Sequence, residues 1–282
     1  MQRMGHYPAP KDAPADIPGL EVAGIIEEIG DSVSEFKVGD KVCALLSGGG
    51  YAEYAIAPAP QCLPIPTGLN FAEAASLPET FFTVWNNVFD KAHFEVGESV
   101  LIHGGSSGIG VAGIQMIKAM GGLVYITAGT TEKCKACEDL GADKAFNYKM
   151  EDFASQIAIF TKNIGVDIVL DMVGGDYANK NIQVLKPKGR LVMINTMKGK
   201  MANIDLLQVL SRQLVITGST LRPQTVAYKS NIASKLLKNI WPLIPSVIRP
   251  VIYKTFPLNE AAAAHHLMEG SSHIGKIVLV NE

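Results

Sequence analysis

The chain has 282 residues, enough for one large or two ordinary domains, and 48% of them are hydrophobic, so it can bury substantial cores. Only 18% are charged and the formal net charge is −2, which gives no electrostatic footprint for nucleic acid or for an anionic membrane. No apolar run reaches transmembrane length and the first residues contain no signal-peptide core, so we expect a cytoplasmic protein.

Residues 1–76 predict a β-rich domain. Short strand candidates at Leu20–Ile29, Lys41–Leu46 and Tyr51–Ala57 are separated by clusters of turn-forming residues. A proline-rich segment then leads to a helix expected at Phe71–Leu77. No helix connects the strands, so the pattern indicates antiparallel pairing rather than βαβ units.

A glycine-rich loop follows the next apolar run, which ends at His103. The loop reads Gly104-Gly-Ser-Ser-Gly-Ile-Gly110, and a helical pattern begins at once behind it. Glycines let a backbone turn tightly and approach a ligand, and a helix N-terminus offers N–H groups to anionic oxygen. Because serines replace the strict G-x-G-x-x-G spacing, a plain strand-turn-helix connection stays open for the loop taken alone.

Strands and helices alternate beyond the loop. Strands are expected at Leu123–Gly129, Lys144–Tyr148, Val166–Val173, Arg190–Thr196 and Gln213–Leu221. Helices are expected between them, at Thr131–Leu140, Glu151–Lys162, Tyr177–Leu185 and Asn203–Leu210. Apolar strands alternating with amphipathic helices predict an α/β domain with a doubly wound parallel sheet of Rossmann type, which makes the loop a dinucleotide-binding loop.

The domain boundaries follow from these patterns. We expect a β-rich domain at residues 1–76, a dinucleotide-binding domain at 77–248, and a return to the first domain at 249–282, which ends in the strand Lys276–Val280. The pair Cys134 and Cys137 forms a C-x-x-C inside a predicted helix, without the turn of a redox motif or the further ligands of a zinc site. We therefore interpret both as ordinary helix cysteines.

The end of the second strand of the α/β unit bears on the cofactor. NAD enzymes place an Asp or Glu about twenty residues after the glycine loop, where it binds the ribose 2′-hydroxyl. Here no carboxylate occurs before Glu132, Lys133 follows it, and Tyr148 ends the next strand. A cation and a phenol suit a 2′-phosphate, which favours NADPH, although a solvated helix lysine is the alternative for Lys133.

Five short motifs of this chain occur in the same order as in a known protein family. Gly19-Leu-Glu-Val-Ala-Gly24, Val38-Gly-Asp-Lys-Val42, Gly50-Tyr-Ala-Glu-Tyr54, the Ser106–Gly110 loop and Gly275-Lys-Ile-Val-Leu279 occur in that order. With them the chain resembles, over essentially its whole length, the zeta-crystallin-like quinone oxidoreductases of the medium-chain dehydrogenase/reductase superfamily, especially the tumour-suppressor-inducible ones and their bacterial counterparts. The resemblance implies a GroES-like catalytic domain into which the Rossmann-type domain is inserted, and a homodimer formed through the nucleotide-binding domains with Gln213–Leu221 as the participating strand.

The same resemblance bears on metal and substrate. Zinc-dependent cousins carry Gly-His-Glu where this chain has Gly19-Leu20-Glu21, and leucine cannot bind a metal, so we expect no metal and a structural role for Glu21. Hydride transfer without a Lewis acid suits acceptors that are already electrophilic, such as quinones and enones.

Site residues follow from the resemblance as well. For substrate it implies Tyr7, whose phenol can donate to a quinone oxygen, and Arg222, which can offset developing negative charge. For the cofactor it implies, together with the loop argument, Thr83, Gly105, Ser106, Ser107, Gly108, Ile109, Gly110, Gly129, Lys133, Tyr148, Val173, Gly174, Asn195, Met197 and Lys276. The histidines His6, His103, His265 and His266 have no partners that indicate a triad or a metal site, and we interpret them as core or surface residues.

The resemblance also implies several dozen residues ahead of Met1, which would form the first strands of the catalytic domain and carry an asparagine and an aspartate near the nicotinamide. The expected reaction is reduction of quinones by NADPH. Two other functions stay open: reduction of enals, enones or enoyl thioesters, and a non-catalytic NADPH-binding scaffold or structural protein.

Overall fold

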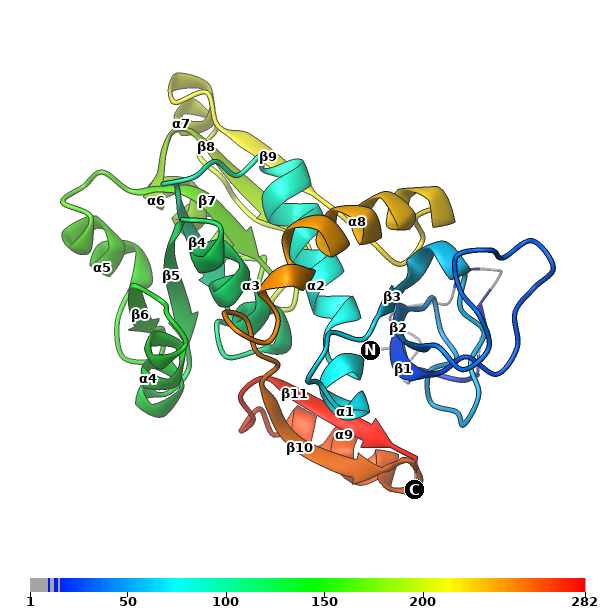
Figure 1. Cartoon of the computed structure of the whole chain (residues 1–282). Coiled ribbons are helices and arrows are strands. Elements are labelled where there is room, and N and C mark those ends of the chain that lie inside the picture. The colour runs from blue at the N-terminus through cyan, green and yellow to red at the C-terminus, as the bar shows by residue number, and fades with distance from the viewer. Residues whose placement is uncertain (1–9, 11–12, 15, 282) are drawn as a thin grey trace. The chain divides into compact units, whose positions relative to one another are not determined.

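The computed structural model describes residues 10, 13–14 and 16–281, and the chain divides into two compact units (Figure 1). Residues 1–83 and 221–282 form one of them, called the discontinuous unit below, and Val84–Thr220 form the other, the central unit. Each unit has its own sheets and its own hydrophobic residues, so each is described by itself.

The central unit is built on a six-stranded parallel sheet with the order β6-β5-β4-β7-β8-β9. Its strands are β4 (Ser99–His103), β5 (Leu123–Ala128), β6 (Lys144–Asn147), β7 (Val166–Asp171), β8 (Leu185–Met193) and β9 (Val215–Gly218). Its helices are α3 (Gly108–Ala119), α4 (Thr131–Asp139), α5 (Phe153–Phe160), α6 (Tyr177–Val184) and α7 (Leu206–Ser211), with a π-helical turn at Trp85–Lys91. The chain winds outward from β4 in both directions, which confirms the predicted doubly wound sheet.

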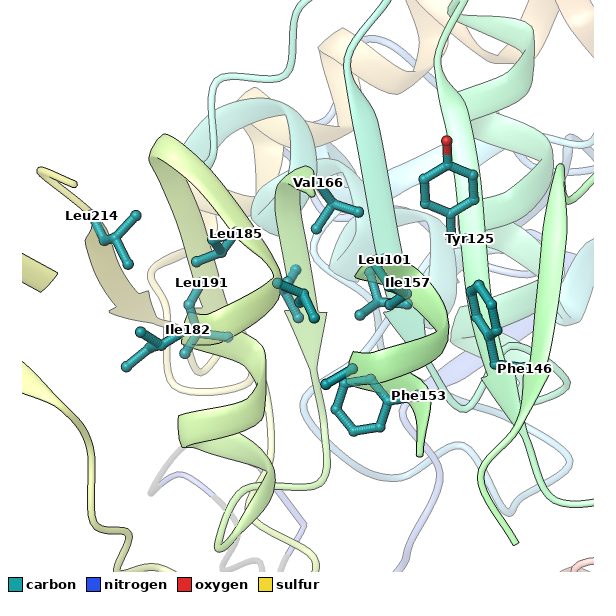
Figure 2. Close-up of a cluster of buried hydrophobic side chains, with 13 residues drawn as sticks. Leu101, Tyr125, Phe146, Phe153, Ile157, Val166, Ile182, Leu185, Leu191 and Leu214 are labelled. Carbon is teal, nitrogen blue, oxygen red and sulfur yellow. The ribbon is translucent and has the colours of Figure 1, made fainter. Parts of the chain in front are cut away.

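Apolar residues explain why the sheet is covered on both faces. All five residues of β4 are buried, and Leu101 points into a cluster formed with Phe153 and Ile157 of α5 and Ile182 of α6 (Figure 2). The neighbouring residue Ile102 faces the other way, against α3, because successive side chains of a strand alternate between the faces. Because both faces of β4 are covered, neither face contacts water, and the middle of the strand is apolar on both sides.

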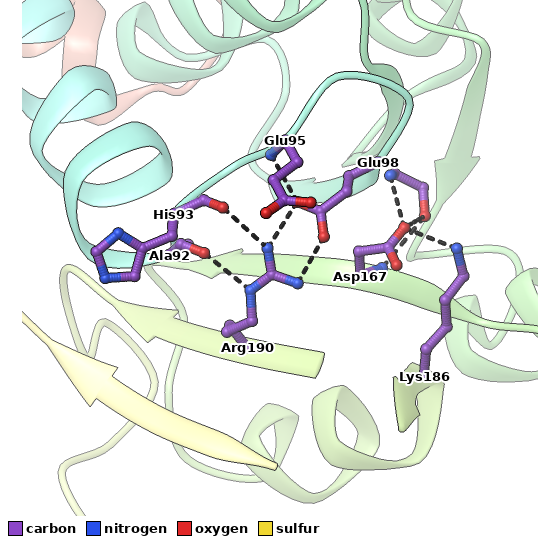
Figure 3. Close-up of polar contacts among 8 residues, drawn as sticks. Ala92, His93, Glu95, Glu98, Asp167, Lys186 and Arg190 are labelled. Carbon is purple, nitrogen blue, oxygen red and sulfur yellow. Dashed lines mark hydrogen bonds and ion pairs between the residues drawn. The ribbon is translucent and has the colours of Figure 1, made fainter. Parts of the chain in front are cut away.

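Ion pairs fix the amino-terminal end of this sheet. Arg190 of β8 bonds both carboxylate oxygens of Glu98, at 2.8 and 2.6 Å, and donates from Nε to the Ala92 carbonyl at 2.8 Å (Figure 3). Beside it, Asp167 accepts from Lys186 Nζ at 2.7 Å and from the Ser99 amide at 2.8 Å (Figure 3). Burial by itself raises the pKa of Asp167, but these hydrogen bonds outweigh it and hold that pKa below its usual range. This end of the sheet is therefore structural.

The discontinuous unit contains two small sheets. Strands β1 (Glu21–Ile25), β2 (Lys41–Leu45) and β3 (Cys62–Pro64) pair antiparallel in that order, as predicted for the first domain, and β10 (Ile252–Pro257) pairs parallel with β11 (Lys276–Val280). The helices are α1 (Phe71–Ala75), α2 (Pro78–Val84, which ends at the unit boundary), α8 (Val226–Asn239) and α9 (Ala261–Glu269). Short 3₁₀ turns lie at Ala59–Gln61, Trp241–Leu243 and Leu258–Glu260.

The strand predicted at Tyr51–Ala57 is wrong, because the segment forms bends and irregular backbone. Its start is tied to a loop instead of a strand, since the Tyr51 amide donates to the Pro18 carbonyl at 2.9 Å. The side chains of Tyr54 and Ile56 are 76% and 97% exposed, so the segment has no buried face for a sheet to cover.

Among the described residues, no helix is long and apolar enough to cross a membrane.

Candidate functional site

The glycine-rich loop joins β4 to α3 at the carboxyl end of the central sheet. Ser107 is the N-cap of α3, and its Oγ accepts from the Gly110 amide at 3.1 Å. The amides of Gly108 and Ile109 lie in the first turn, where a helix supplies no carbonyl partner. The loop therefore presents backbone N–H groups and the positive end of a helix dipole to any anion bound there.

Two glycines of the loop are required by close approach. A Cβ placed on Gly110 would lie 2.3 Å from the Gly105 carbonyl oxygen, and one on Gly105 would lie 2.6 Å from Cβ of Ile126. The Gly105 amide also donates to the Thr127 carbonyl at 3.0 Å, which fixes the loop to β5. Larger residues at Gly105 would push the loop away from β5, and larger residues at Gly110 would push it away from α3. Glycine at both positions therefore lets the loop pack closely against the strand and the helix.

The loop lies at the topological switch point of the sheet. Strand β4 pairs with β5 on one side and with β7 on the other, and the chain reverses direction of winding between them (Figure 1). In open α/β sheets, ligands bind in the crevice outside the carboxyl ends of the strands at this point. The fold thus places the predicted pyrophosphate loop where such folds hold their ligand.

A buried aspartate shapes the neighbouring turn after β7. Asp171 is fully buried, and its Oδ1 accepts from the amides of Val173 at 2.7 Å and Gly174 at 3.2 Å. The turn meets the loop after β8, since the Lys198 amide donates to the Val173 carbonyl at 2.8 Å and Gly174 bridges to Gly199. The structure therefore brings the predicted Val173-Gly174 segment beside the loop that carries Asn195 and Met197.

A phenol and a cation follow the carboxyl ends of β6 and β5, respectively. A Cβ on Gly129 would lie 2.8 Å from the Tyr148 hydroxyl, so this hydroxyl covers the backbone at the end of β5. Thr130 caps α4 and accepts from the Lys133 amide at 3.2 Å, which places Lys133 in the first turn of that helix. Burial lowers the pKa of Lys133, and Lys149 lowers it further. Glu132, the nearest carboxylate in sequence, is exposed.

A pocket of the central unit includes a lysine that sequence reasoning missed. Its volume is about 330 Å³, and Gly175, Asp176, Tyr177, Lys180, Lys198 and Met201 line it. Lys198 Nζ lies 5.8 Å from the ring centroid of Tyr148 and 5.0 Å from that of Tyr177, so it contacts a predicted cofactor residue. The available signal was its place just behind the carboxyl end of a parallel strand, where ligands bind.

His103, the last residue of β4, is fully buried and bonded through both ring nitrogens. Nδ1 lies 2.9 Å from Thr127 Oγ1, and Nε2 lies 2.7 Å from Asn181 Oδ1. Burial lowers its pKa, although Asp171 and the bond to Asn181 oppose this. The interpretation of His103 as a core histidine is confirmed, and it joins β4 to β5 and α6 directly beneath the glycine loop.

In the discontinuous unit, Glu21 of β1 binds two elements. One carboxylate oxygen forms an ion pair with Lys276 of β11, and the other accepts from the Glu79 amide of α2 at 2.9 Å. The predicted cofactor residue Lys276 is therefore held on Glu21. Burial, and then the Glu21 carboxylate, raise the pKa of Glu79 to about 7, although Lys276, Lys229 and Arg222 lower it.

The predicted substrate residue Arg222 lies against the loop after β2. Its Nε donates to the Ser47 carbonyl at 2.8 Å, and Lys229 of α8 donates to Ser47 Oγ at 3.0 Å and to the Arg222 carbonyl at 2.9 Å. The predicted cofactor residue Thr83 is a buried residue of α2. Tyr7 lies outside the described residues.

The C-x-x-C cysteines lie inside a helix of the central unit. Cys134 and Cys137 are buried in α4, as interpreted from the sequence, and burial raises the pKa of Cys137 to about 12. Within the part of the chain that the structure describes, no three side chains of the His, Cys, Asp and Glu types are grouped to hold a metal ion.

Comparison with known proteins identifies the family. Residues 1–67 match the alcohol dehydrogenase GroES-like domain, and residues 108–237 match the zinc-binding dehydrogenase domain. The chain is 35% identical over 285 residues to quinone oxidoreductase of Mus musculus, covering 99% of this chain and 83% of that protein. The chain belongs to the quinone oxidoreductase family. It is accordingly an oxidoreductase of the medium-chain dehydrogenase/reductase superfamily, as the sequence motifs predicted.

Solved structures agree with this assignment. Quinone oxidoreductase of Escherichia coli, crystallised with NADPH, superimposes with a TM-score of 0.85 at 27% identity, covering 99% of this chain and 86% of that one. The CurK enoyl reductase superimposes with a TM-score of 0.82 at 29% identity, covering 95% and 80%. Both confirm a GroES-like domain combined with a Rossmann-type domain, and they show that this family member shares its fold with reductases of different acceptors.

Proposed function

We propose that this protein reduces quinones with NADPH and without zinc. One observation carries the choice of cofactor: the Tyr148 hydroxyl covers Gly129 and Lys133 lies in the first turn of α4, while no carboxylate follows β5 directly. A 2′-phosphate needs donors and positive charge there, and an Asp or Glu would repel it. The curated relative named quinone oxidoreductase and the NADPH-bound Escherichia coli structure support the same reading.

The residues present fit a dinucleotide. The close approach at Gly105 and Gly110 leaves a cradle that a Cβ would fill, and the amides of Gly108 and Ile109 would hold the pyrophosphate. The loops after β7 and β8, which carry Val173, Gly174, Asn195 and Met197, would hold the remainder. Thr83 and Lys276 are proposed as further cofactor residues from the resemblance alone. When bound, NADPH supplies the hydride, and the protein contributes position and electrostatics.

Binding of the substrate requires a protein group that stabilises negative charge on the acceptor. Reduction of a quinone leaves charge on its oxygen, and the Arg222 guanidinium, fixed on Ser47, would stabilise it; Tyr7 is the second residue proposed for this task. Leu20 stands where zinc-dependent cousins have a histidine ligand, so the acceptor must be electrophilic by itself.

The experiment is NADPH oxidation by the purified chain with an ortho-quinone acceptor, compared with NADH under the same conditions. We expect turnover with a kcat/KM for NADPH well above that for NADH. In parallel, the binding of NADPH is measured by the quenching of protein fluorescence. Tight binding without turnover on any acceptor would favour the scaffold function instead.

A second candidate activity is reduction of enals, enones or enoyl thioesters. The likeness to the CurK enoyl reductase favours it, because the same fold there carries that chemistry. A panel of quinones and α,β-unsaturated carbonyl compounds at matched concentration separates the two, since the true substrate class should have the higher kcat/KM.

We further propose that the protein works as a homodimer in the cytosol. Strand β9 is the edge of the central sheet, with Val215 and Ile216 48% and 38% exposed, so a second copy can extend the sheet there. The cysteines are all free thiols in the structure, which suits a reducing compartment.

A further inference from the structure

We propose that Glu79 supplies the proton that completes reduction of the substrate, a role that rests on the proposed function. The sequence analysis did not identify a side chain that donates this proton. Glu79 lies in the first turn of α2, charged groups surround it, and no described residue pairs with its carboxyl group.

The position of Glu79 is fixed by its backbone. It is the second residue of α2, and its amide donates to Glu21 Oε2 at 2.9 Å, while Lys276 holds the other Glu21 oxygen. Three elements, β1, β11 and α2, are thereby joined at one point. The side chain of Glu79 consequently starts from a rigid site, as a group that transfers a proton requires.

The carboxyl group itself is unengaged. Among the described residues, none forms a hydrogen bond or an ion pair with the Glu79 side chain, although the cations Lys276, Lys229 and Arg222 all act on it. Lys276 is bonded to Glu21, and Lys229 to Ser47 and to the Arg222 carbonyl. The Glu79 residue as a whole is neither fully buried nor fully exposed.

The charges around Glu79 suit a proton donor near neutral pH. Burial and the Glu21 carboxylate favour the protonated form, and the three cations favour the ionised form, which leaves the pKa at about 7. Tyr51, which also faces Glu21, has its own pKa raised by burial and by that carboxylate, so it stays protonated. A general acid is most effective when its pKa lies near the working pH.

The position relative to the proposed substrate groups fits the same role. Arg222, proposed to stabilise charge on the quinone oxygen, is one of the cations that act on Glu79. Thr83, proposed to lie at the nicotinamide, follows Glu79 by four residues on α2 and therefore shares its face of the helix.

The proposed reduction consists of a hydride transfer followed by a proton transfer. The acceptor gains a hydride and becomes the hydroquinone anion; the O–H bond of the Glu79 carboxyl then breaks, and its proton forms the second hydroxyl of the hydroquinone. Glu79 is left as a carboxylate, which the neighbouring cations stabilise, and it regains a proton from water before the next turnover. No further oxidant or reductant is needed.

The test is the pH dependence of kcat for Glu79→Gln, with saturating NADPH and an ortho-quinone, between about pH 5.5 and 9. Because the acid form is required, wild-type kcat should be level below about pH 7 and fall above it. In Glu79→Gln we expect kcat to be reduced roughly 10- to 100-fold with no such fall, since water replaces the carboxyl group. NADPH affinity should stay as in the wild type. Glu79→Asp, which keeps an acid, should restore the falling limb with part of the rate.

The matched control is Glu53→Gln, which removes an exposed carboxylate of the same unit and should keep the wild-type profile. A Glu79→Gln protein that keeps both the wild-type kcat and the fall above pH 7 would overturn the proton-donor role while the quinone reductase function stands. Wild-type protein that binds NADPH but turns over no acceptor would overturn the proposed function, and the role of Glu79 with it.

Discussion

At the scale of single residues, the proposed preference for NADPH depends on Tyr148 and Lys133. Tyr148 directly follows β6 and Lys133 lies in the first turn of α4, and the Tyr148 hydroxyl lies against the backbone of Gly129, which precedes both residues in sequence. Their combination of a phenol and a cation is what a phosphate monoester on a ribose needs.

Replacing these residues should therefore change cofactor preference more than rate. We expect Lys133→Ala and Tyr148→Phe each to raise KM for NADPH roughly 10- to 100-fold, since a hydrogen bond to a charged group contributes about 1.5–3 kcal/mol. KM for NADH should change little. Steady-state kinetics with both cofactors measures this, with Lys135→Ala as the control, because Lys135 lies exposed on the same helix and pairs with Asp139. An equal loss for NADPH and NADH would show that the two residues do not bind the 2′-phosphate.

At the scale of elements, the glycine loop and α3 act as one part. The backbone of α3 at Gly110 packs closely against the carbonyl groups of the loop, and Ser107 caps the helix. His103 anchors the preceding strand from below through Thr127 and Asn181. The proposed binding of a pyrophosphate therefore depends on this strand-loop-helix unit rather than on any one of its residues.

A single methyl group should disrupt that unit. In Gly110→Ala the new Cβ would meet the carbonyl oxygens of Gly105 and Gly104 at 2.3 and 2.4 Å, and backbone atoms cannot move aside cheaply. We expect a loss of about 1–3 kcal/mol in the free energy of unfolding, measured by chemical denaturation, together with loss of NADPH binding. Gly30→Ala is the control, because no heavy atom lies within 4 Å of its added Cβ. Unchanged stability and NADPH binding in Gly110→Ala would contradict the close packing described for the loop.

At the scale of the whole molecule, the central unit exposes several apolar side chains next to one edge of its sheet. Leu206, Leu207 and Leu210 on α7 are 69%, 69% and 76% exposed, and α7 directly precedes the edge strand β9. Exposed leucines on one side of a helix and an unpaired strand edge are both costly for a monomer in water. A second copy of the chain would cover both, which supports the proposed dimer.

Charge placed on this surface should separate the copies. We expect the wild type to have the mass of a dimer by light scattering, and Leu207→Lys/Leu210→Lys to shift it toward the monomer because buried lysines oppose association. Ile159→Lys is the control, since Ile159 is 70% exposed on α5 of the same unit. A monomeric wild type, or a double variant that stays dimeric, would argue against α7 and β9 as the interface.

The sequence predicted the elements best where local patterns and burial agree. Continuous apolar strands and capped helices gave the α/β domain with its order of elements, and the glycine loop lies where the pattern placed it. The prediction failed at Tyr51–Ala57, whose residues are typical of a strand, because strand formation also needs a neighbour and a buried face. Strand β8 begins at Leu185, ahead of the expected Arg190, because its first residue pairs with Val166 of β7.

The amino-acid sequence by itself determined the periodicity of its elements, the glycine-rich loop between a strand and a helix, and the family, because these depend on residues that are close in the chain. Only the tertiary structure decided which charges meet. Glu79 acquires its surroundings from Glu21, 58 residues away, and Glu21 from Lys276, 255 residues away. Lys198 likewise reaches Tyr148 only because the sheet aligns the ends of separate strands. Electrostatic interactions depend on distance in space, and no local pattern encodes that distance.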